Sequence, residues 1–216
     1  MALRITVALA ALSAAASAAA GPCDIFAAAG TPCVCAHSVV RALYAAYNGP
    51  LYLLRRASDS HTAVVATTAA GGFANVATQA AFCAGTSCVI WRIFDQSPFA
   101  NDLSIAPPGG YVPRIDKGVN ASRWPVSVGG NKVFGAFFEG AMGYRIDATN
   151  SVATGNEAET LYMVTSGKHV NGGECAQGSA RVRARVRARA RVRRCTVQAH
   201  ASERVRAPRP SLCACA

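Results

Sequence analysis

Short apolar runs separated by turn residues dominate the chain beyond residue 50. Five runs are rich in the β-branched and aromatic residues that favour strands: 51–54, 89–94, 126–128, 133–138 and 161–164. Between them lie Gly71-Gly72, Pro107-Pro108-Gly109-Gly110 and Gly129-Gly130-Asn131, which allow the chain to reverse. Many short strands with such turns indicate an all-β sandwich or barrel. Some runs are apolar on both faces, so we expect two packed sheets.

One segment nearer the N-terminus has helical periodicity instead. Ser38 is a candidate N-cap, and apolar residues at positions 39, 40, 43, 44 and 47 follow it with the spacing of one helical face. Asn48-Gly49-Pro50 ends the pattern. The sequence therefore predicts one short helix, over 39–47.

The first twenty residues have the pattern of a secretory signal peptide. Arg4 provides a positive charge, 5–16 is apolar, and Ala18-Ala19-Ala20 is a small-residue cleavage site. A membrane anchor is the alternative, but the apolar run is shorter than the roughly 20 residues that a bilayer requires. We expect cleavage before Gly21, a secreted, extracellular protein and no membrane partner.

The composition excludes disorder of the whole chain and locates its charge. Of 216 residues, 51% are hydrophobic, and the net charge is +11. Residues 174–216 hold 11 Arg and 2 Glu, which is +9, whereas residues 1–173 hold 11 basic and 9 acidic side chains, which is +2. The length and the charge distribution together indicate one nearly neutral domain with a basic tail.

In this tail, arginine alternates with valine or alanine from Arg181 to Arg193. A strand would place these like charges on one face, and a helix would have no apolar stripe, so disorder is expected. A polyanion-binding arm is the alternative function, although a secreted protein is not expected to meet nucleic acid. A GC repeat in DNA encodes Arg-Ala, and one base change gives Arg-Val. We therefore interpret 174–216 as aberrant translation, from a retained intron or a shifted frame.

Two pairs of cysteines are close in sequence, and secretion places them in an oxidising compartment. We expect the disulfides Cys23–Cys33 and Cys83–Cys88. Cys35 makes the cysteine count of the body odd and competes for Cys23. Zinc binding is the alternative, but a repeated C-x-x-C spacing and suitably spaced histidines are lacking, so no metal is expected.

Asn120-Ala121-Ser122 has the pattern of an N-glycosylation sequon. We expect this tripeptide on a loop and name Asn120 as a candidate glycosylation site. Sequons also occur by chance, so the sequence does not decide whether the site is occupied.

The order of several short motifs resembles that of a known family. The N-terminal motifs are Gly21-Pro22-Cys23-Asp24-Ile25, Gly30-Thr31-Pro32-Cys33-Val34, Ala36-His37-Ser38, Arg41-Ala42-Leu43-Tyr44 and Tyr47-Asn48-Gly49-Pro50-Leu51-Tyr52. Further motifs are Phe82-Cys83-Ala84, Asp95-Gln96-Ser97, Ala106-Pro107-Pro108-Gly109-Gly110, Gly143-Tyr144-Arg145, Ala153-Thr154-Gly155-Asn156-Glu157 and Gly167-Lys168-His169-Val170-Asn171. Over about 21–171 the chain resembles the fungal α-L-arabinofuranosidases of glycoside hydrolase family 54, and beyond Asn171 the resemblance ends.

This resemblance implies a concanavalin-like two-sheet β-sandwich and retaining hydrolysis of terminal arabinofuranosyl groups of arabinan and arabinoxylan. Such hydrolysis uses two carboxyl groups roughly 5 to 5.5 Å apart. In the family both lie beyond the point where the resemblance ends, so no catalytic residue is assigned. Two departures are Cys35, where a small non-cysteine residue is expected, and Pro98-Phe99, in place of a glycine-rich turn. We expect an arabinose-containing plant cell-wall polysaccharide as the partner, no cofactor, and a monomer.

The acids of the body each have a structural interpretation. Those that follow the predicted helix and the first predicted strand, beyond Asp24 and Asp59, are Asp95, Asp102, Asp116, Glu139, Asp147, Glu157 and Glu159. Asp95 and Asp102 flank a turn, where a carboxylate accepts backbone N–H groups. Glu157 and Glu159 are typical of a solvated loop, and Glu139 and Asp147 of turn or rim positions. Sequence spacing does not show which acids converge across a sandwich, so no catalytic pair is named.

Histidine and tryptophan side chains are expected to pack rather than to catalyse. His37, His61 and His169 are interpreted as packing or hydrogen-bonding residues. Trp91 and Trp124 are candidates for stacking on sugar rings, but Trp91 lies inside an apolar run and is expected in the core.

Taken together, the sequence predicts that residues 21–173 form the N-terminal part of a catalytic domain. We expect this part to be inactive alone, and poorly soluble because strand edges would be exposed. A non-catalytic carbohydrate-binding sandwich is the alternative class of function.

Overall fold

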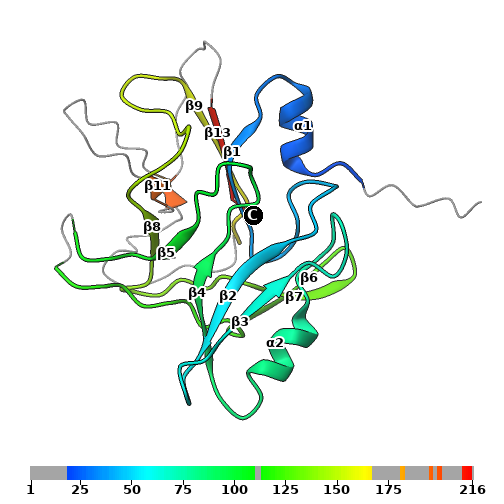
Figure 1. The fold of residues 1–216 in the computed structure, drawn as a ribbon, viewed down its shortest axis with the longest axis vertical. Coiled ribbons are helices and arrows are strands. Elements are labelled where there is room, and N and C mark those ends of the chain that lie inside the picture. The colour runs from blue at the N-terminus through cyan, green and yellow to red at the C-terminus, as the bar shows by residue number, and fades with distance from the viewer. Residues whose placement is uncertain are drawn as a thin grey trace, which may run out of the picture.

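Strands predominate in the computed structural model, which describes residues 19–109 and 113–166 together with four short strands of the tail as backbone (Figure 1). The helices are α1 (Pro22–Ala28) and α2 (Val76–Phe82). The strands of the body are β1 (Cys33–His37), β2 (Pro50–Arg56), β3 (Thr62–Ala66), β4 (Cys88–Ile93), β5 (Leu103–Ile105), β6 (Trp124–Val128), β7 (Asn131–Gly135), β8 (Tyr144–Ile146) and β9 (Glu159–Met163). The tail strands are β10 (Arg181–Val182), β11 (Cys195–Thr196), β12 (Ala199–His200) and β13 (Ser211–Cys215). The predicted all-β class is confirmed.

The largest sheet is antiparallel, with six strands in the order β11-β8-β5-β4-β2-β3. In its centre, β2 pairs with β4 so that Tyr52 is opposite Ile93, and a register shift follows between Leu53 and Leu54. A second sheet has the order β1-β13-β9, with parallel pairing, and β6 and β7 form a hairpin. At the tip of this hairpin Gly129 and Gly130 have φ values of 54° and 78°, which glycine adopts without steric cost.

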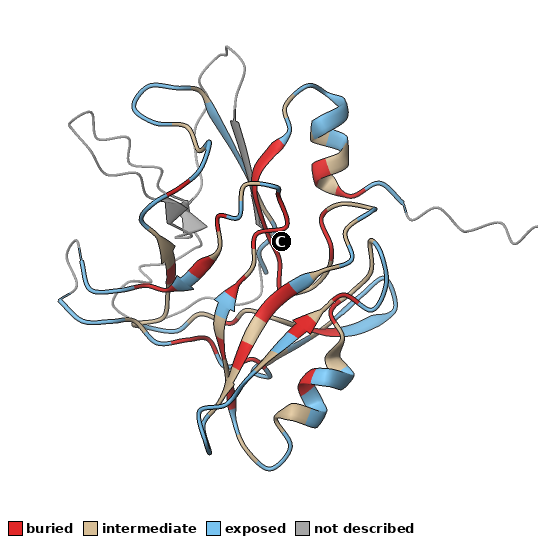
Figure 2. Ribbon diagram, in the orientation of Figure 1, coloured by how far each residue is buried: buried red, intermediate tan, exposed pale blue. Residues whose placement is uncertain are grey.

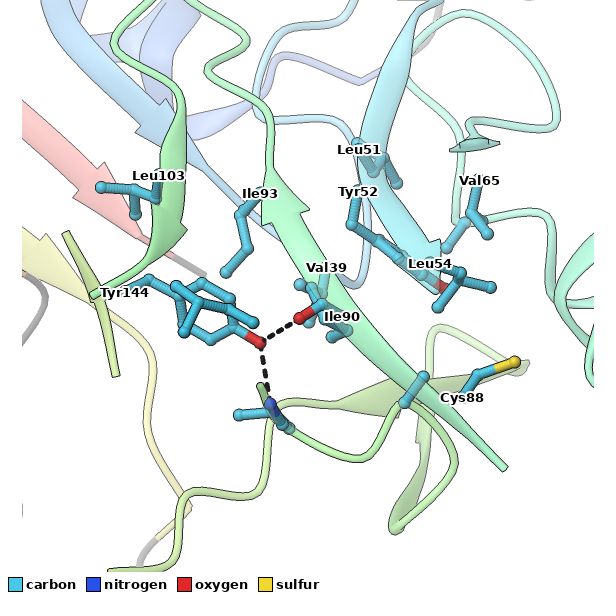
Figure 3. Packing of buried hydrophobic residues seen from close by; sticks show 14 residues of the cluster. Val39, Leu51, Tyr52, Leu54, Val65, Cys88, Ile90, Ile93, Leu103 and Tyr144 are labelled. Atoms are coloured by element: carbon cyan, nitrogen blue, oxygen red, sulfur yellow. Dashed lines mark hydrogen bonds between the residues drawn. The ribbon is translucent and has the colours of Figure 1, made fainter. Parts of the chain in front are cut away.

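The main core lies against the six-stranded sheet. Figure 2 shows buried residues along β1, β2, β4 and β5. Figure 3 shows the cluster that β2, β3, β4, β5 and β8 build with residues from neighbouring loops, including Val39, Leu51, Tyr52, Leu54, Val65, Ile90, Ile93, Leu103 and Tyr144. Burying one leucine side chain in such a core stabilises the folded state by about 1.5–3 kcal/mol relative to leaving it exposed. This core holds the central sheet in place.

Both disulfides expected from the sequence are present. Cys23 of α1 is bonded to Cys33 of β1, and Cys83, at the C-cap of α2, is bonded to Cys88 at the start of β4. Each bond therefore joins a helix to a strand. Cys35 is buried in β1 and is not among these bonded cysteines.

The helix predicted over 39–47 is wrong. Ser38 does cap locally, because its Oγ accepts from the backbone nitrogens of Val40 and Arg41, each at 3.1 Å. The backbone beyond it bonds to another segment: the nitrogen of Ala42 donates to the oxygen of Gly72 at 2.8 Å, and Ala74 donates to Val40 at 3.0 Å. The apolar periodicity thus places side chains in the core without helical hydrogen bonds. The short helix near the N-terminus is α1 instead.

The strand predictions agree better with the structure. The five predicted runs overlap β2, β4, β6, β7 and β9, whereas β1, β3, β5 and β8 were not predicted. The disorder predicted for 174–216 falls mostly outside the described residues, apart from the backbone of β10 to β13. The signal peptide prediction likewise falls almost entirely outside them.

Candidate functional site

The most highly connected polar side chain of the described residues is Asp95, just after β4. Its Oδ1 accepts from the backbone nitrogens of Ala36 at 2.7 Å and Ser97 at 2.9 Å. Its Oδ2 accepts from the nitrogen of Asn101 at 2.8 Å and from the Oγ of Ser97 at 2.7 Å. Asp95 is only 8% exposed, so these four donors replace water around its charge.

Asp102 acts in the same turn. Its Oδ1 accepts from the backbone nitrogen of Asp95 at 2.9 Å, and its Oδ2 lies 3.9 Å from Arg92 Nη1. The expectation that both aspartates accept backbone N–H groups at a turn is confirmed. This arrangement commits Asp95 to holding the chain rather than to proton transfer.

Gln96 ties the same turn to the segment before β2. Its Oε1 accepts from the nitrogen of Leu43 at 2.6 Å, and its Nε2 donates to the oxygen of Arg41 at 3.2 Å. Its backbone nitrogen also donates to Ala36 at 2.8 Å. The motif Asp95-Gln96-Ser97 therefore fixes β1 and the irregular segment after it against β4.

His37 and Asn101 complete the group of side chains around Asp95, which we call the Asp95 cluster and which also includes Gln96, Ser97 and Asp102. His37 is buried, and its Nε2 donates to the carbonyl oxygen of Asn101 at 2.7 Å. The side chain of Asn101, which is fully buried, donates to Val34 at 2.8 Å and Asn150 at 3.0 Å and accepts from the nitrogen of Asn150 at 2.7 Å. His37 thus has the hydrogen-bonding role that the sequence predicts. Asn101 was missed, because a single polar residue in a turn gives no sequence signal of burial.

The other histidines and acids are dispersed. His61 is exposed and lies 3.3 Å from Asp59, and His169 is outside the described residues. Glu157 accepts from the nitrogen of Thr154 at 2.7 Å within a turn, and Glu159 is exposed in β9. Asp147 pairs with Arg145 at 2.7 Å. Glu157 and Asp147 match the expected loop and rim roles, whereas Glu159 is exposed as expected but lies in a strand and not on a loop.

Asp116 and Glu139 line one open groove on the surface. This Trp91 groove has a volume of about 540 Å³, and its lining includes Val89, Trp91, Asp116, Asn120, Glu139 and Met142. Trp91 is half-buried there, and Arg55 lies 4.5 Å above the centre of its ring. Trp91 therefore packs against the core only in part. Trp124 stacks on Phe137 at 5.2 Å.

A second groove, of about 510 Å³, lies next to the Cys83–Cys88 disulfide. Its lining includes Ser87, Asn120, Ser122 and Arg123, and we call it the Arg123 groove. Asn120 lines both grooves and stands between them.

Four tyrosines are held in the protonated form. Burial raises the pKa of Tyr44 and of Tyr47 to about 12, with nearby aspartates adding to the effect. Burial also raises the pKa of Tyr52 and of Tyr144 well above its usual value. None of these phenols is therefore suited to act as a base near neutral pH.

Among residues 19–109 and 113–166, no group of three or more His, Cys, Asp or Glu side chains is placed to hold a metal ion. In the same part of the chain, no helix has the length and apolarity needed to cross a membrane.

Comparison with known proteins identifies the class to which this fold belongs. The family model described as "Alpha-L-arabinofuranosidase B, catalytic" matches residues 22–191, which is well over half of the chain. The chain belongs to this family of glycoside hydrolase catalytic domains. The match extends past Asn171, where the sequence resemblance was expected to end.

Individual relatives carry the name of the same family. The chain is 49% identical over 161 residues to the probable alpha-L-arabinofuranosidase B of Aspergillus terreus, covering 73% of this chain and 32% of that protein. It is 48% identical over 168 residues to the alpha-L-arabinofuranosidase B of Penicillium canescens, covering 76% and 36%. The chain thus spans about a third of the length of the curated relatives it matches.

Solved structures agree in fold. An arabinofuranosidase complexed with arabinofuranosyl-alpha-1,2-xylobiose matches with a TM-score of 0.62 and 44% identity, over 63% of this chain and 29% of that chain. A family 54 arabinofuranosidase soaked with a cyclic sulfate inhibitor matches equally well. These matches support the predicted β-sandwich for the part of the domain that the chain covers.

Proposed function

We propose that this chain supplies the N-terminal part of the catalytic domain of a secreted α-L-arabinofuranosidase. The intact enzyme would be a retaining glycoside hydrolase that releases terminal arabinofuranosyl groups from arabinan and arabinoxylan. The observation that carries the proposal is the match to the family model of the catalytic domain, over residues 22–191. A neighbouring structure with a bound arabinofuranosyl-xylobiose supports the substrate class.

In this proposal the described residues form the scaffold rather than the reacting groups. The carboxylates of Asp95 and Asp102 are occupied by backbone donors. The acids of the Trp91 groove, Asp116 and Glu139, lie on an open surface. We assign no catalytic carboxylate to this chain, and the pair is expected from the remainder of the domain.

A chimera tests whether this segment is a working part of such an enzyme. Residues 21–166 would replace the matching segment of the Aspergillus terreus relative, with secretion and release of 4-nitrophenol from 4-nitrophenyl α-L-arabinofuranoside measured. We expect secreted, active enzyme, because the Asp95 cluster and both disulfides are retained. Folded, monomeric chimera without activity would contradict the proposal, and the unaltered relative is the matched control.

Two further parts of the proposal concern the ends of the chain. We propose that 1–20 is removed on secretion, so that the secreted protein begins at Gly21, which N-terminal sequencing tests. We also propose that the arginine-rich part of 174–216 arises from aberrant translation, even though the family match reaches residue 191 and so includes part of the run that begins at Arg181. Sequencing the spliced message across the codons for 165–180 tests this, and a correctly spliced exon that encodes the arginine run would contradict it.

A further inference from the structure

A candidate attachment point for sugar lies at the rim of the Trp91 groove. Asn120 is exposed, and Asn120-Ala121-Ser122 is the single N-glycosylation sequon of the chain. The Oδ1 of Asn120 accepts from the nitrogen of Ser122 at 3.0 Å. This bond engages the amide oxygen and not the amide nitrogen, which is the atom that takes a sugar.

The sequon is held rigidly against β4 rather than on an extended loop. Asn120 forms an antiparallel bridge with Val89. On either side of it, Ile90 donates to Val119 at 2.8 Å and Ala121 donates to Cys88 at 3.0 Å. These bonds to β4 therefore fix the backbone at Asn120 and the direction in which its side chain extends from the surface.

Trp91 shares the face of β4 on which Asn120 lies. Val89, the bridge partner of Asn120, also lines the groove beside Trp91, which places Trp91 and Asn120 on the same face of β4. Both residues line the groove. Arg55 covers one face of the indole, and the remaining aromatic surface is bordered by Met142 and by Ile115, which is 58% exposed. A sugar has apolar C–H faces that pack on such a surface, while Asp116 and Glu139 can accept from its hydroxyl groups.

We propose that Asn120 carries an N-linked glycan whose first two sugars lie in the Trp91 groove. On attachment, the Nδ2 of Asn120 bonds to C1 of the reducing-end N-acetylglucosamine of a lipid-diphosphate oligosaccharide. The lipid diphosphate leaves with the electrons of the broken C1–O bond, and the amide proton passes to a base of the transferase. Because the glycan is tethered at the rim, its local concentration in the groove is high. The inference rests on entry into the secretory pathway, as in the proposed function.

Mass spectrometry tests the attachment. The full chain would be produced behind a heterologous secretion leader in a eukaryotic host, and both medium and cell lysate analysed, so that failure of its own leader or of export does not hide the result. We expect a series of masses one hexose apart, and conversion of Asn120 to aspartate by peptide N-glycosidase. N120Q and S122A abolish the glycan, S122T keeps it, and N131Q, at an exposed asparagine outside any sequon, leaves it unchanged. An unmodified Asn120 in leader-processed chain overturns the proposal.

The position of the sugars has its own readout. An endoglycosidase that cuts between the first two sugars is expected to act about tenfold faster on native W91A than on the native wild type, a factor that corresponds to about 1.4 kcal/mol. W91F keeps an aromatic ring and stays near the wild-type rate, and so does W124F, the other tryptophan. All four proteins are cut equally fast after denaturation. Equal rates on native W91A and wild type would overturn the placement in the groove. Arabinofuranosidase activity enters neither test, so the proposed function can fail independently.

Discussion

The hydroxyl group of Tyr144 donates to the carbonyl oxygen of Ile90 at 2.7 Å, between strands that are 54 residues apart in the chain. The same hydroxyl accepts from the backbone nitrogen of Val119 at 2.8 Å (Figure 3). Tyr144 thus joins β8, β4 and the segment that carries Asn120. The phenol stands where a water molecule would otherwise be needed to satisfy two buried backbone groups.

Removing this hydroxyl is expected to destabilise the fold. Y144F leaves a buried N–H and weakens a buried carbonyl contact, so the free energy of unfolding should fall by about 1–3 kcal/mol. Urea denaturation followed by circular dichroism measures the change. Y162F, in which the edge-on contact of that ring with Phe26 is kept, is the control and should stay within about 0.5 kcal/mol. Equal losses in the two variants would show that the Tyr144 bonds are not the cause.

The buried tyrosines also predict loss of stability in alkali. The pKa of Tyr44 and Tyr47 is raised to about 12 in the folded protein, against about 10 in an unfolded chain. Below pH 10 both states keep their protons, and the tyrosine contribution to stability is fully present. Above pH 10 the unfolded state releases protons that the folded state retains, so the free energy of unfolding falls as pH rises toward 12.

Absorbance at 295 nm and circular dichroism, recorded on one alkaline titration, measure this effect. We expect phenolate to appear together with the loss of strand signal. Phenolates that form near pH 10 while the strand signal stays constant would contradict the prediction.

Gly118 is expected to tolerate no side chain. A Cβ at this position would lie 2.7 Å from the carbonyl oxygen of Ile90, the atom that also accepts from Tyr144. The added Cβ and the carbonyl oxygen of Ile90 are both attached directly to the backbone and cannot rotate away. G118A should therefore force β4 and the segment around Gly118 apart and lower the free energy of unfolding by about 1–3 kcal/mol. Gly140 has no atom within 4 Å of the corresponding position, and G140A is the matched control. Thermal unfolding of the two variants compares them directly, and an unchanged midpoint for G118A would show that the close approach is not needed.

Replacing Asp95 by asparagine tests the cluster at the end of β4. The new amide group would face either the donors on Oδ1 or those on Oδ2, and at least one buried backbone N–H would lose its acceptor. We expect D95N to lose about 2–5 kcal/mol and to be secreted poorly. D102N, at a more exposed carboxylate that accepts from a single backbone nitrogen, should lose less. A smaller loss for D95N than for D102N would contradict the assigned order of importance.

The sequence predicts the central strands because their runs of apolar residues are short and bounded by turns, as at 89–94. It does not predict β1, β3, β5 or β8. Of these, Leu103–Ile105 and Tyr144–Ile146 have three residues each and are too short to show an alternating pattern. The helix wrongly predicted over 39–47 has a different cause, because here a local pattern is present but does not decide the structure. Its local signals are real, including the cap at Ser38, but the partners of its backbone lie at residues 72–74 and 96.

The candidate site is predicted in part. The turn role of Asp95 follows from its residue type and neighbours, and both disulfides follow from sequence proximity. The partial exposure of Trp91 does not follow, since an apolar run gives no sign that Arg55 from β2 and residues 115–120 form a groove around it. Contacts between segments far apart in sequence decide such features, and a single sequence does not encode them in a readable local pattern.

The Asp95 cluster sets an order of events during synthesis. Ala36 obtains its acceptor only after residue 95 has left the ribosome, and at 5 to 20 residues per second this takes at least about 3 seconds. During that interval we expect both Cys33 and Cys35 to be able to react with Cys23, because the bond between Ala36 and Asp95 has not yet fixed β1. Once the nitrogen of Ala36 donates to Asp95, β1 is fixed with Cys33 toward α1. Exchange of the disulfide from Cys33 to Cys35 would then require breaking this hydrogen bond.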